Sequence, residues 1–216
     1  MKKYFAELIG TFALVFCGTG AIVINTQTHG QVGHIGIAFT FGLIVMAMIY
    51  CFGNISGAHF NPAVTLGFAV VGLFDKKEIL PFVAAQLIGA FFATYTLHFL
   101  FPGDFLLGTT LPSGTEMQSL ILEFILTFIL MLVILFTSQG KKEIQHLAGL
   151  VIGGVILLEA MFAGPVCGAS MNPARSIAPA VVTANLEHLW VYLAGPFSGA
   201  LVAAFVWKFM ASPETK

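Results

Sequence analysis

Charged residues are scarce in this sequence: they make up 9% of its 216 residues, against about 25% in an ordinary soluble domain. So few charges could not cover the surface of a soluble globule. Nine Lys and Arg stand against ten Asp and Glu, which leaves a formal net charge of −1. The clustered cations that phosphate binding requires are therefore missing, and nucleic acid is excluded as a main partner.

Cysteine is also rare. Cys17, Cys51 and Cys167 are too few and too scattered for a disulfide framework or a zinc site. The sequence predicts no metal site, no cofactor and no covalent chemistry. What the chain has in abundance is hydrophobic residues, at 58%, and we therefore expect an integral membrane protein.

Crossing the hydrocarbon core of a bilayer takes about 20 apolar residues in a helix. Six runs meet this requirement: 5–24, 34–53, 80–100, 119–138, 147–164 and 188–210. Two shorter apolar stretches, 61–72 and 172–183, can reach only about half way across. The pattern predicts six spans and two re-entrant half-helices.

The lysines predict the orientation of these spans. Alternate loops carry all of them, and the intervening loops carry none: Lys2, Lys3, Lys76, Lys77, Lys141, Lys142, Lys208 and Lys216. The positive-inside rule then places both termini in the cytoplasm and the protein in the cell membrane, plasma or inner. Lysines before an apolar run also occur in secretion signals, but five further spans favour a retained first helix.

The chain repeats itself in reverse orientation. Residues 57–63 (GAHFNPA) match 168–174 (GASMNPA), Glu7 matches Glu123 in the fourth span, and Gly89 matches Gly199 in the sixth. Each half holds three spans, an odd number, so the second copy must be inverted relative to the first. We expect one channel domain over 1–216, with repeat one at about 4–100, a linker at 101–118 and repeat two at about 119–210.

Both repeats contain Asn-Pro, which is typical of a helix start. Asn61 and Asn172 would cap the half-helices through their side-chain oxygens, with Pro at the first helical position. Each side-chain NH₂ would then be free to point off the helix end. Two positive dipole ends and two amide donors would meet at the middle of the membrane. Simple capping of buried helices is the alternative, but two inverted copies favour a shared site.

Paired Asn-Pro-Ala boxes, ordered glutamates and the shared Gly-Ala-x-x-Asn-Pro-Ala context resemble the aquaporins, the major intrinsic protein family, over essentially the whole chain. The resemblance implies an all-α membrane protein: a right-handed bundle of six helices and two half-helices. It also implies one pore per subunit, a homotetramer and no enzymatic activity. Asn61 and Asn172 would hold one water oxygen at the pore midplane, which interrupts proton transfer along the water chain.

The resemblance further implies roles for individual residues. The pore-lining carbonyls would come from Gly57, Ala58, His59, Phe60, Gly168, Ala169, Ser170 and Met171. The narrow selectivity filter would consist of Phe41, Ala160, Ala169 and Arg175. Glu7 and Glu123 would accept hydrogen bonds from backbone N–H groups of the two re-entrant loops.

The filter departs from the water-specific pattern, which has His where Ala160 stands, so we expect a wider and less polar aperture. The run 163–172 looks most like the plant nodulin-type proteins, which pass small uncharged solutes as well as water. Ser176 follows Arg175 where dedicated glycerol facilitators have Asp. Water is therefore the expected main cargo, with glycerol, urea or neutral metalloid acids in addition.

Three residues and two other functions stay open at this point. Glu159 could face the vestibule or bond within the bundle, Cys167 could be a mercurial target or a small apolar filler, and His146 could gate or merely mark a boundary. An ion- or proton-coupled secondary transporter also uses inverted repeats, but it needs acids that face a cavity. A membrane scaffold would need larger external loops than 25–33 and 101–118.

Overall fold

The computed structural model describes residues 1–211, a helical bundle without a β-strand in that range. Within these residues six helices are long and apolar enough to cross a membrane. They are α1 (Lys2–Gln27), α2 (Gly33–Ser56), α4 (Ile79–Leu100), α5 (Glu116–Ser138), α7 (Ala148–Cys167) and α9 (Val191–Met210). The short elements are α3 (Pro62–Val70), the 3-10 helix η1 (Lys76–Glu78), α6 (Lys142–His146) and α8 (Pro173–Val182). The all-α class, the six spans and the two half-helices are confirmed.

One span ends later than the sequence predicts. The fifth run was expected to stop at 164, before Pro165, but α7 continues through this proline to Cys167. Proline removes a single intrahelical hydrogen bond, and a membrane helix tolerates this where the freed carbonyl finds another donor. The left-handed Gly168, at φ +82°, then ends α7, as Gly57 at φ +89° ends α2.

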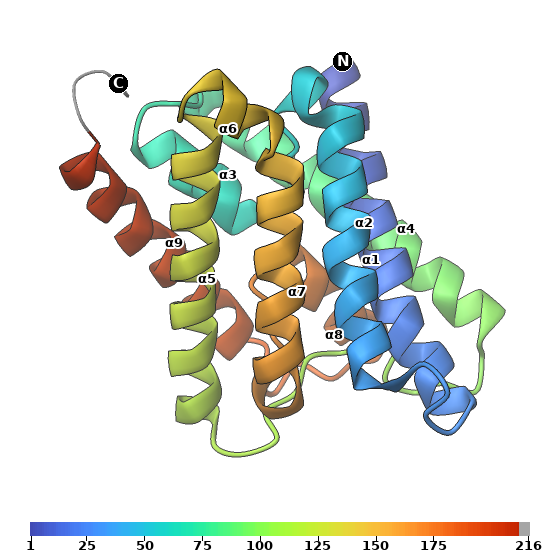
Figure 1. Ribbon diagram of the computed structural model, residues 1–216. Helices are drawn as coiled ribbons and strands as arrows, with labels where there is room; N and C mark the ends of the chain where they lie inside the picture. Colours follow the sequence, from blue (N-terminus) through green and yellow to red (C-terminus); the bar gives the residue numbers. More distant parts are fainter. Residues whose placement is uncertain (212–216) are drawn as a thin grey trace.

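The long helices surround the two half-helices (Figure 1). α1 starts, and α9 ends, at the same end of the bundle, which we call the terminal end; the segment between α4 and α5 lies at the opposite end. α3 lies toward the terminal end and α8 toward the opposite end. The described lysines lie at or near the terminal end of their helices, and Lys216 lies outside the described residues.

Glycines allow the helix backbones to approach closely at matching places in the two halves. A Cβ on Gly89 of α4 would overlap the Leu8 carbonyl oxygen of α1, and a Cβ on Gly199 of α9 would overlap the Phe124 carbonyl oxygen of α5. Small residues permit such packing in membranes, where apolar association gives little driving force between helices. The two contacts are consistent with the inverted repeat.

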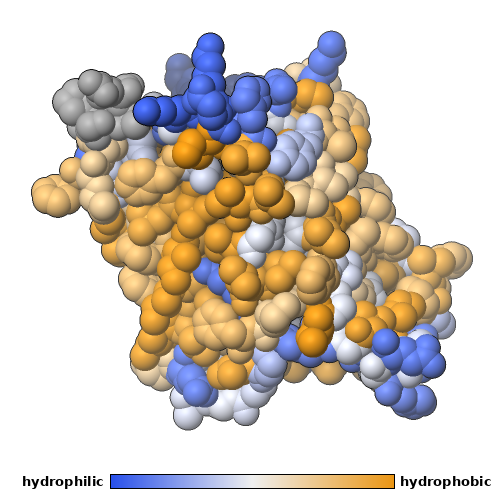
Figure 2. Space-filling model, viewed as in Figure 1, coloured by the Kyte–Doolittle hydropathy of each residue, from blue (hydrophilic) through white to orange (hydrophobic). Residues whose placement is uncertain are grey.

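The outer surface carries an apolar band between two hydrophilic ends (Figure 2). Large apolar side chains are exposed on several helices, among them Phe92, Phe99, Phe162 and Phe205, which are 59%, 83%, 63% and 61% exposed. Such a surface suits lipid or another apolar partner rather than water. The interior, in contrast, contains the polar groups of both Asn-Pro motifs, and these build the site.

Candidate functional site: a pore beside two half-helix tips

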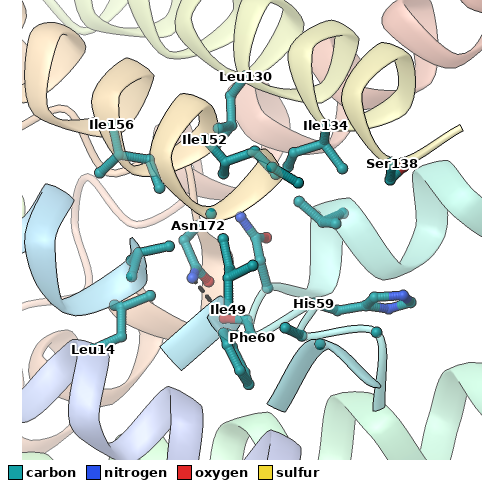
Figure 3. Close-up of a pocket in the computed structure, with 18 of the residues that line it drawn as sticks. Leu14, Ile49, His59, Phe60, Leu130, Ile134, Ser138, Ile152, Ile156 and Asn172 are labelled. Carbon is teal, nitrogen blue, oxygen red and sulfur yellow. Dashed lines mark hydrogen bonds between the residues drawn. The ribbon is translucent and has the colours of Figure 1, made fainter. Parts of the chain in front are cut away.

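The tips of the two half-helices are joined by a pair of crossed hydrogen bonds. Asn61 caps α3 by accepting from the Ala63 N–H at 2.9 Å, and Asn172 caps α8 by accepting from the Ala174 N–H at 3.0 Å. The Asn61 Nδ2 donates to the Met171 carbonyl at 2.7 Å, and the Asn172 Nδ2 donates to the Phe60 carbonyl at 2.8 Å. Figure 3 shows the second of these bonds beside the cavity.

These bonds correct one expectation from the sequence, that both side-chain NH₂ groups would be free. Each amide has two N–H donors, and one of them is taken by the loop of the other repeat. The reason is that the Phe60 and Met171 carbonyls are buried at this depth and need a donor. One N–H of each asparagine is left, and each carbonyl keeps a second lone pair.

The loops before the half-helices have a backbone that few residues adopt. Ala58 and Phe60 have φ +52° and +50°, and the equivalent Ala169 and Met171 have φ +40° and +53°. Left-handed geometry at non-glycine residues is costly and clusters at functional sites. Here it turns successive carbonyls away from a helical pattern, so that they are free to accept bonds from elsewhere.

Two buried glutamates accept hydrogen bonds from the backbone N–H groups of these loops. Glu7 of α1 accepts from the His59 N–H at 3.0 Å and the Phe60 N–H at 2.8 Å. Glu123 of α5 accepts from the Ser170 N–H at 2.7 Å and the Met171 N–H at 2.8 Å. Both carboxylates are fully buried. Backbone donors inside a membrane require such partners, so the acids have a structural use.

Around each glutamate the two repeats differ. Glu7 also accepts from the Ser56 hydroxyl at 2.7 Å and the Gln86 amide at 2.7 Å, whereas the residue that matches Gln86 in the second repeat is Pro196. In the second repeat a chain of hydroxyls supports the loop itself: the Thr110 hydroxyl donates to Ser176 at 2.9 Å, and Ser176 lies 2.6 Å from the Ser170 hydroxyl. Sequence reasoning missed these supporting contacts, because a buried Gln, Ser or Thr gives no signal without its partner.

Arg175 is held at the first turn of α8 and is only 2% exposed. Its Nη1 donates to the Gly108 carbonyl at 2.7 Å, and its guanidinium carbon lies 5.3 Å from the centre of the Phe41 ring. Gly108 belongs to the segment that links the repeats, at φ +71°, where a Cβ would meet Thr19 at 2.8 Å. The sequence did not indicate that this loop holds the arginine, because a backbone carbonyl carries no residue signature.

One cavity of about 540 Å³ connects these groups. Its lining includes both asparagines, all four expected filter residues (Phe41, Ala160, Ala169 and Arg175) and seven of the eight residues expected to offer carbonyls, Gly168 being the exception. The opposite wall is apolar and comes from α1, α2, α5 and α7: Leu14, Ile49, Leu130, Ile134, Ile152 and Ile156 (Figure 3). At the terminal end His146 joins the lining.

Two residues left open by the sequence are now placed. Glu159 is 4% exposed, and neither carboxylate oxygen has a hydrogen-bond partner among the described residues, so it neither faces a vestibule nor bonds within the bundle. Cys167 is fully buried, lies outside the cavity lining and donates from Sγ to the Ala163 carbonyl. Among residues 1–211 no group of three His, Cys, Asp or Glu could hold a metal ion.

A cavity with an apolar wall on one side and the polar groups of two joined helix tips on the other defines a membrane channel for small neutral molecules. The sequence matches the family described as major intrinsic protein over residues 1–207. It is 46% identical to aquaporin NIP1-1 of Oryza sativa subsp. japonica and 47% identical to aquaporin NIP1-1 of Zea mays, each over 212 residues. These alignments cover 97% of this chain and 74% and 75% of the relatives.

A solved structure shows the same architecture. The aquaglyceroporin from Plasmodium falciparum superposes with a TM-score of 0.88 at 30% sequence identity, covering 99% of this chain and 98% of that one. The chain belongs to the major intrinsic protein family. It is a passive, non-enzymatic channel of the membrane for water and small neutral solutes.

The coupled transporter that the sequence left as an alternative gains no support. It requires acids that face the cavity, whereas Glu7, Glu123 and Glu159 are all absent from the described lining. The first two are occupied by loop N–H groups.

Proposed function

We propose that solutes cross this protein in single file between the joined half-helix tips and the apolar wall of the cavity, and that Asn61 and Asn172 act as the pore midplane. The crossed bonds carry this proposal. The side-chain oxygen of each asparagine accepts a hydrogen bond from its own half-helix, and one side-chain N–H donates to the loop of the other repeat. These two bonds fix the direction of the remaining N–H. Two such donors can bind one water oxygen, and that water then cannot pass a proton along the chain.

The filter is proposed to consist of Phe41, Ala160, Ala169 and Arg175. Arg175 has five N–H donors, of which one is bonded to Gly108, and its Nε has no partner among the described residues. The free donors would bind permeant oxygens, and the fixed positive charge would oppose cations. Two of the four positions are alanines, which leaves room for solutes larger than water.

We infer water as the main cargo, with glycerol, urea or neutral metalloid acids as further solutes. The small side chains of Ala160 and Ala169 support the wider range, as does the similarity to an aquaglyceroporin as well as to aquaporins. The carbonyls of the two loops would replace the hydrogen bonds that a solute loses on leaving water.

The orientation and assembly are proposals as well. The lysines of the terminal end support a cytoplasmic location for both termini, in a cell membrane, plasma or inner. The family resemblance supports a homotetramer with one pore per subunit, and the exposed apolar side chains offer the surface for it. The matching glycine contacts support two inverted repeats within a single channel domain.

Stopped-flow light scattering on proteoliposomes tests the proposed pore. An osmotic shock should shrink loaded vesicles faster than empty ones, with a low activation energy and no response to a proton gradient. Parallel glycerol, urea and boric acid gradients then measure the solute range. Asn172→Leu, which removes the midplane donor, should reduce water flux per protein. Unchanged flux in this variant, with the wild type conducting, would refute the midplane role.

A further inference from the structure

Pro165 leaves a backbone carbonyl of α7 without its usual partner. A proline has no N–H, so the Met161 carbonyl, four residues earlier, cannot receive an intrahelical hydrogen bond. In a membrane such a carbonyl is costly unless another donor reaches it. Met161 directly follows Ala160, one of the residues that line the cavity at the proposed filter.

The missing donor comes from a different helix. His34, in the first turn of α2, places its Nε2 2.6 Å from the Met161 carbonyl oxygen. A carbonyl can only accept, so this nitrogen carries the proton. The ring lies against Gly164, where a Cβ would approach the His34 Cε1 to 2.8 Å. Gly164 thus provides the space in which the imidazole reaches the helix.

The same turn of α7 is held at two further points by the loop between α4 and α5. The Ser113 hydroxyl donates to the Pro165 carbonyl at 2.8 Å, and the Ser113 N–H donates to the Val166 carbonyl at 3.0 Å. Three carbonyls at the end of α7 are therefore satisfied from outside the helix. Of the two residues that do this, His34 acts nearest to Ala160.

We propose that His34 is a positioning residue for the selectivity filter: its hydrogen bond to Met161 fixes the proline-containing last turns of α7 and thereby the place of Ala160 in the pore wall. His34 is absent from the cavity lining and does not touch solute. The inference rests on the proposed filter, because it concerns the width of the aperture that Ala160 borders.

The test measures the ratio of glycerol permeability to water permeability, rather than either permeability alone. In proteoliposomes, His34→Phe keeps a ring but removes the donor, and we expect it to change the glycerol-to-water permeability ratio by about threefold or more, the range that one net hydrogen bond allows. His34→Gln, which can still donate, should bring the ratio back toward that of the wild type. A general structural defect would lower both fluxes together and leave the ratio unchanged.

A second experiment, in the variant Pro165→Ala, tests whether the effect of His34 depends on the free Met161 carbonyl. Pro165→Ala restores an N–H that can bond Met161 within the helix, so His34→Phe should have no effect on the ratio when Pro165→Ala is present. An unchanged ratio in the single variant His34→Phe, or an equal change in both backgrounds, would overturn the inference. A wild-type protein that conducts neither water nor glycerol would instead refute the proposed function.

Discussion

Gly42 of α2 and Gly153 of α7 lie backbone to backbone, and a side chain on either glycine would collide with the backbone of the other helix. A Cβ on Gly42 would come within 2.6 Å of the Gly153 carbonyl oxygen, and a Cβ on Gly153 within 2.6 Å of the Gly42 carbonyl oxygen. The two positions differ by 111 residues, the same offset as the two Asn-Pro motifs. Two of the helices that line the apolar wall, α2 and α7, therefore meet at equivalent positions of the two repeats.

Gly153→Ala should destabilise the protein by about 1–3 kcal/mol, because the added methyl group forces α2 and α7 apart. Gly154→Ala is the matched control, since a Cβ at the neighbouring glycine meets no atom within 4 Å. Thermal unfolding in detergent, followed by circular dichroism, compares the two variants. Equal midpoints for both would contradict the close crossing.

Arg175→Ala should admit larger solutes and some cations, because it removes both a positive charge and bulk from the proposed filter. Glycerol flux relative to water flux should rise, and a membrane potential should drive measurable ion current. Val64→Ala, at the matching position of the first repeat, also lines the cavity and should leave ion exclusion intact. Unaltered selectivity in Arg175→Ala would remove this residue from the filter.

Ala160→His should narrow the aperture and suppress glycerol flux more than water flux, since the imidazole adds bulk and a donor to the cavity wall. Ala160→Gly, which adds nothing to the wall, should not lower glycerol flux. Both are measured by swelling and shrinkage of the same liposomes with protein amount determined by immunoblot. An equal loss of both fluxes in Ala160→His would show that Ala160 is wrongly assigned.

Glu159→Leu should stabilise the protein, whereas Glu123→Leu should destabilise it. Both side chains are buried, but Glu159 has no hydrogen-bond partner among the described residues, while Glu123 accepts from two loop N–H groups. Replacing an unpartnered buried acid by a hydrocarbon of similar size removes a desolvation cost. Leaving two buried N–H groups without an acceptor costs about 1–3 kcal/mol each.

Thermal unfolding distinguishes these two cases as well, with Glu123→Gln as an intermediate variant that keeps a single acceptor oxygen. Its midpoint should lie between those of the wild type and Glu123→Leu. A higher midpoint for Glu123→Leu than for Glu159→Leu would contradict the assigned contacts.

The sequence predicted much of this architecture because membrane spans need long apolar runs, and because Asn-Pro at a half-length run is a strong helix-start signal. It placed Asn61, Asn172, Phe41, Ala160, Ala169 and Arg175 at positions that the structure brings to one cavity; their roles in conduction remain predictions. It also anticipated that Glu7 and Glu123 would bond the loops.

The sequence did not predict contacts made by groups that have no recognisable sequence pattern. Three such contacts depend on tertiary geometry. Arg175 donates to the Gly108 carbonyl, and His34 donates to the Met161 carbonyl. One N–H of each asparagine side chain donates to a carbonyl in the loop of the other repeat. The end of α7 was misplaced for a related reason. Pro165 predicts a stop locally, but α7 continues to Cys167, and the Met161 carbonyl that the proline leaves free is bonded by His34, 127 residues away along the chain.

The crossed bonds between Asn61 and Met171, and between Asn172 and Phe60, have a consequence for biosynthesis. Neither half of the chain can complete its own loop, because each supplies the donor that the other needs. A chain with only its first three spans would lack the second-repeat partners of one Asn61 N–H and of the Phe60 carbonyl. The junction of the two loops is therefore complete only when both halves of the chain are in place.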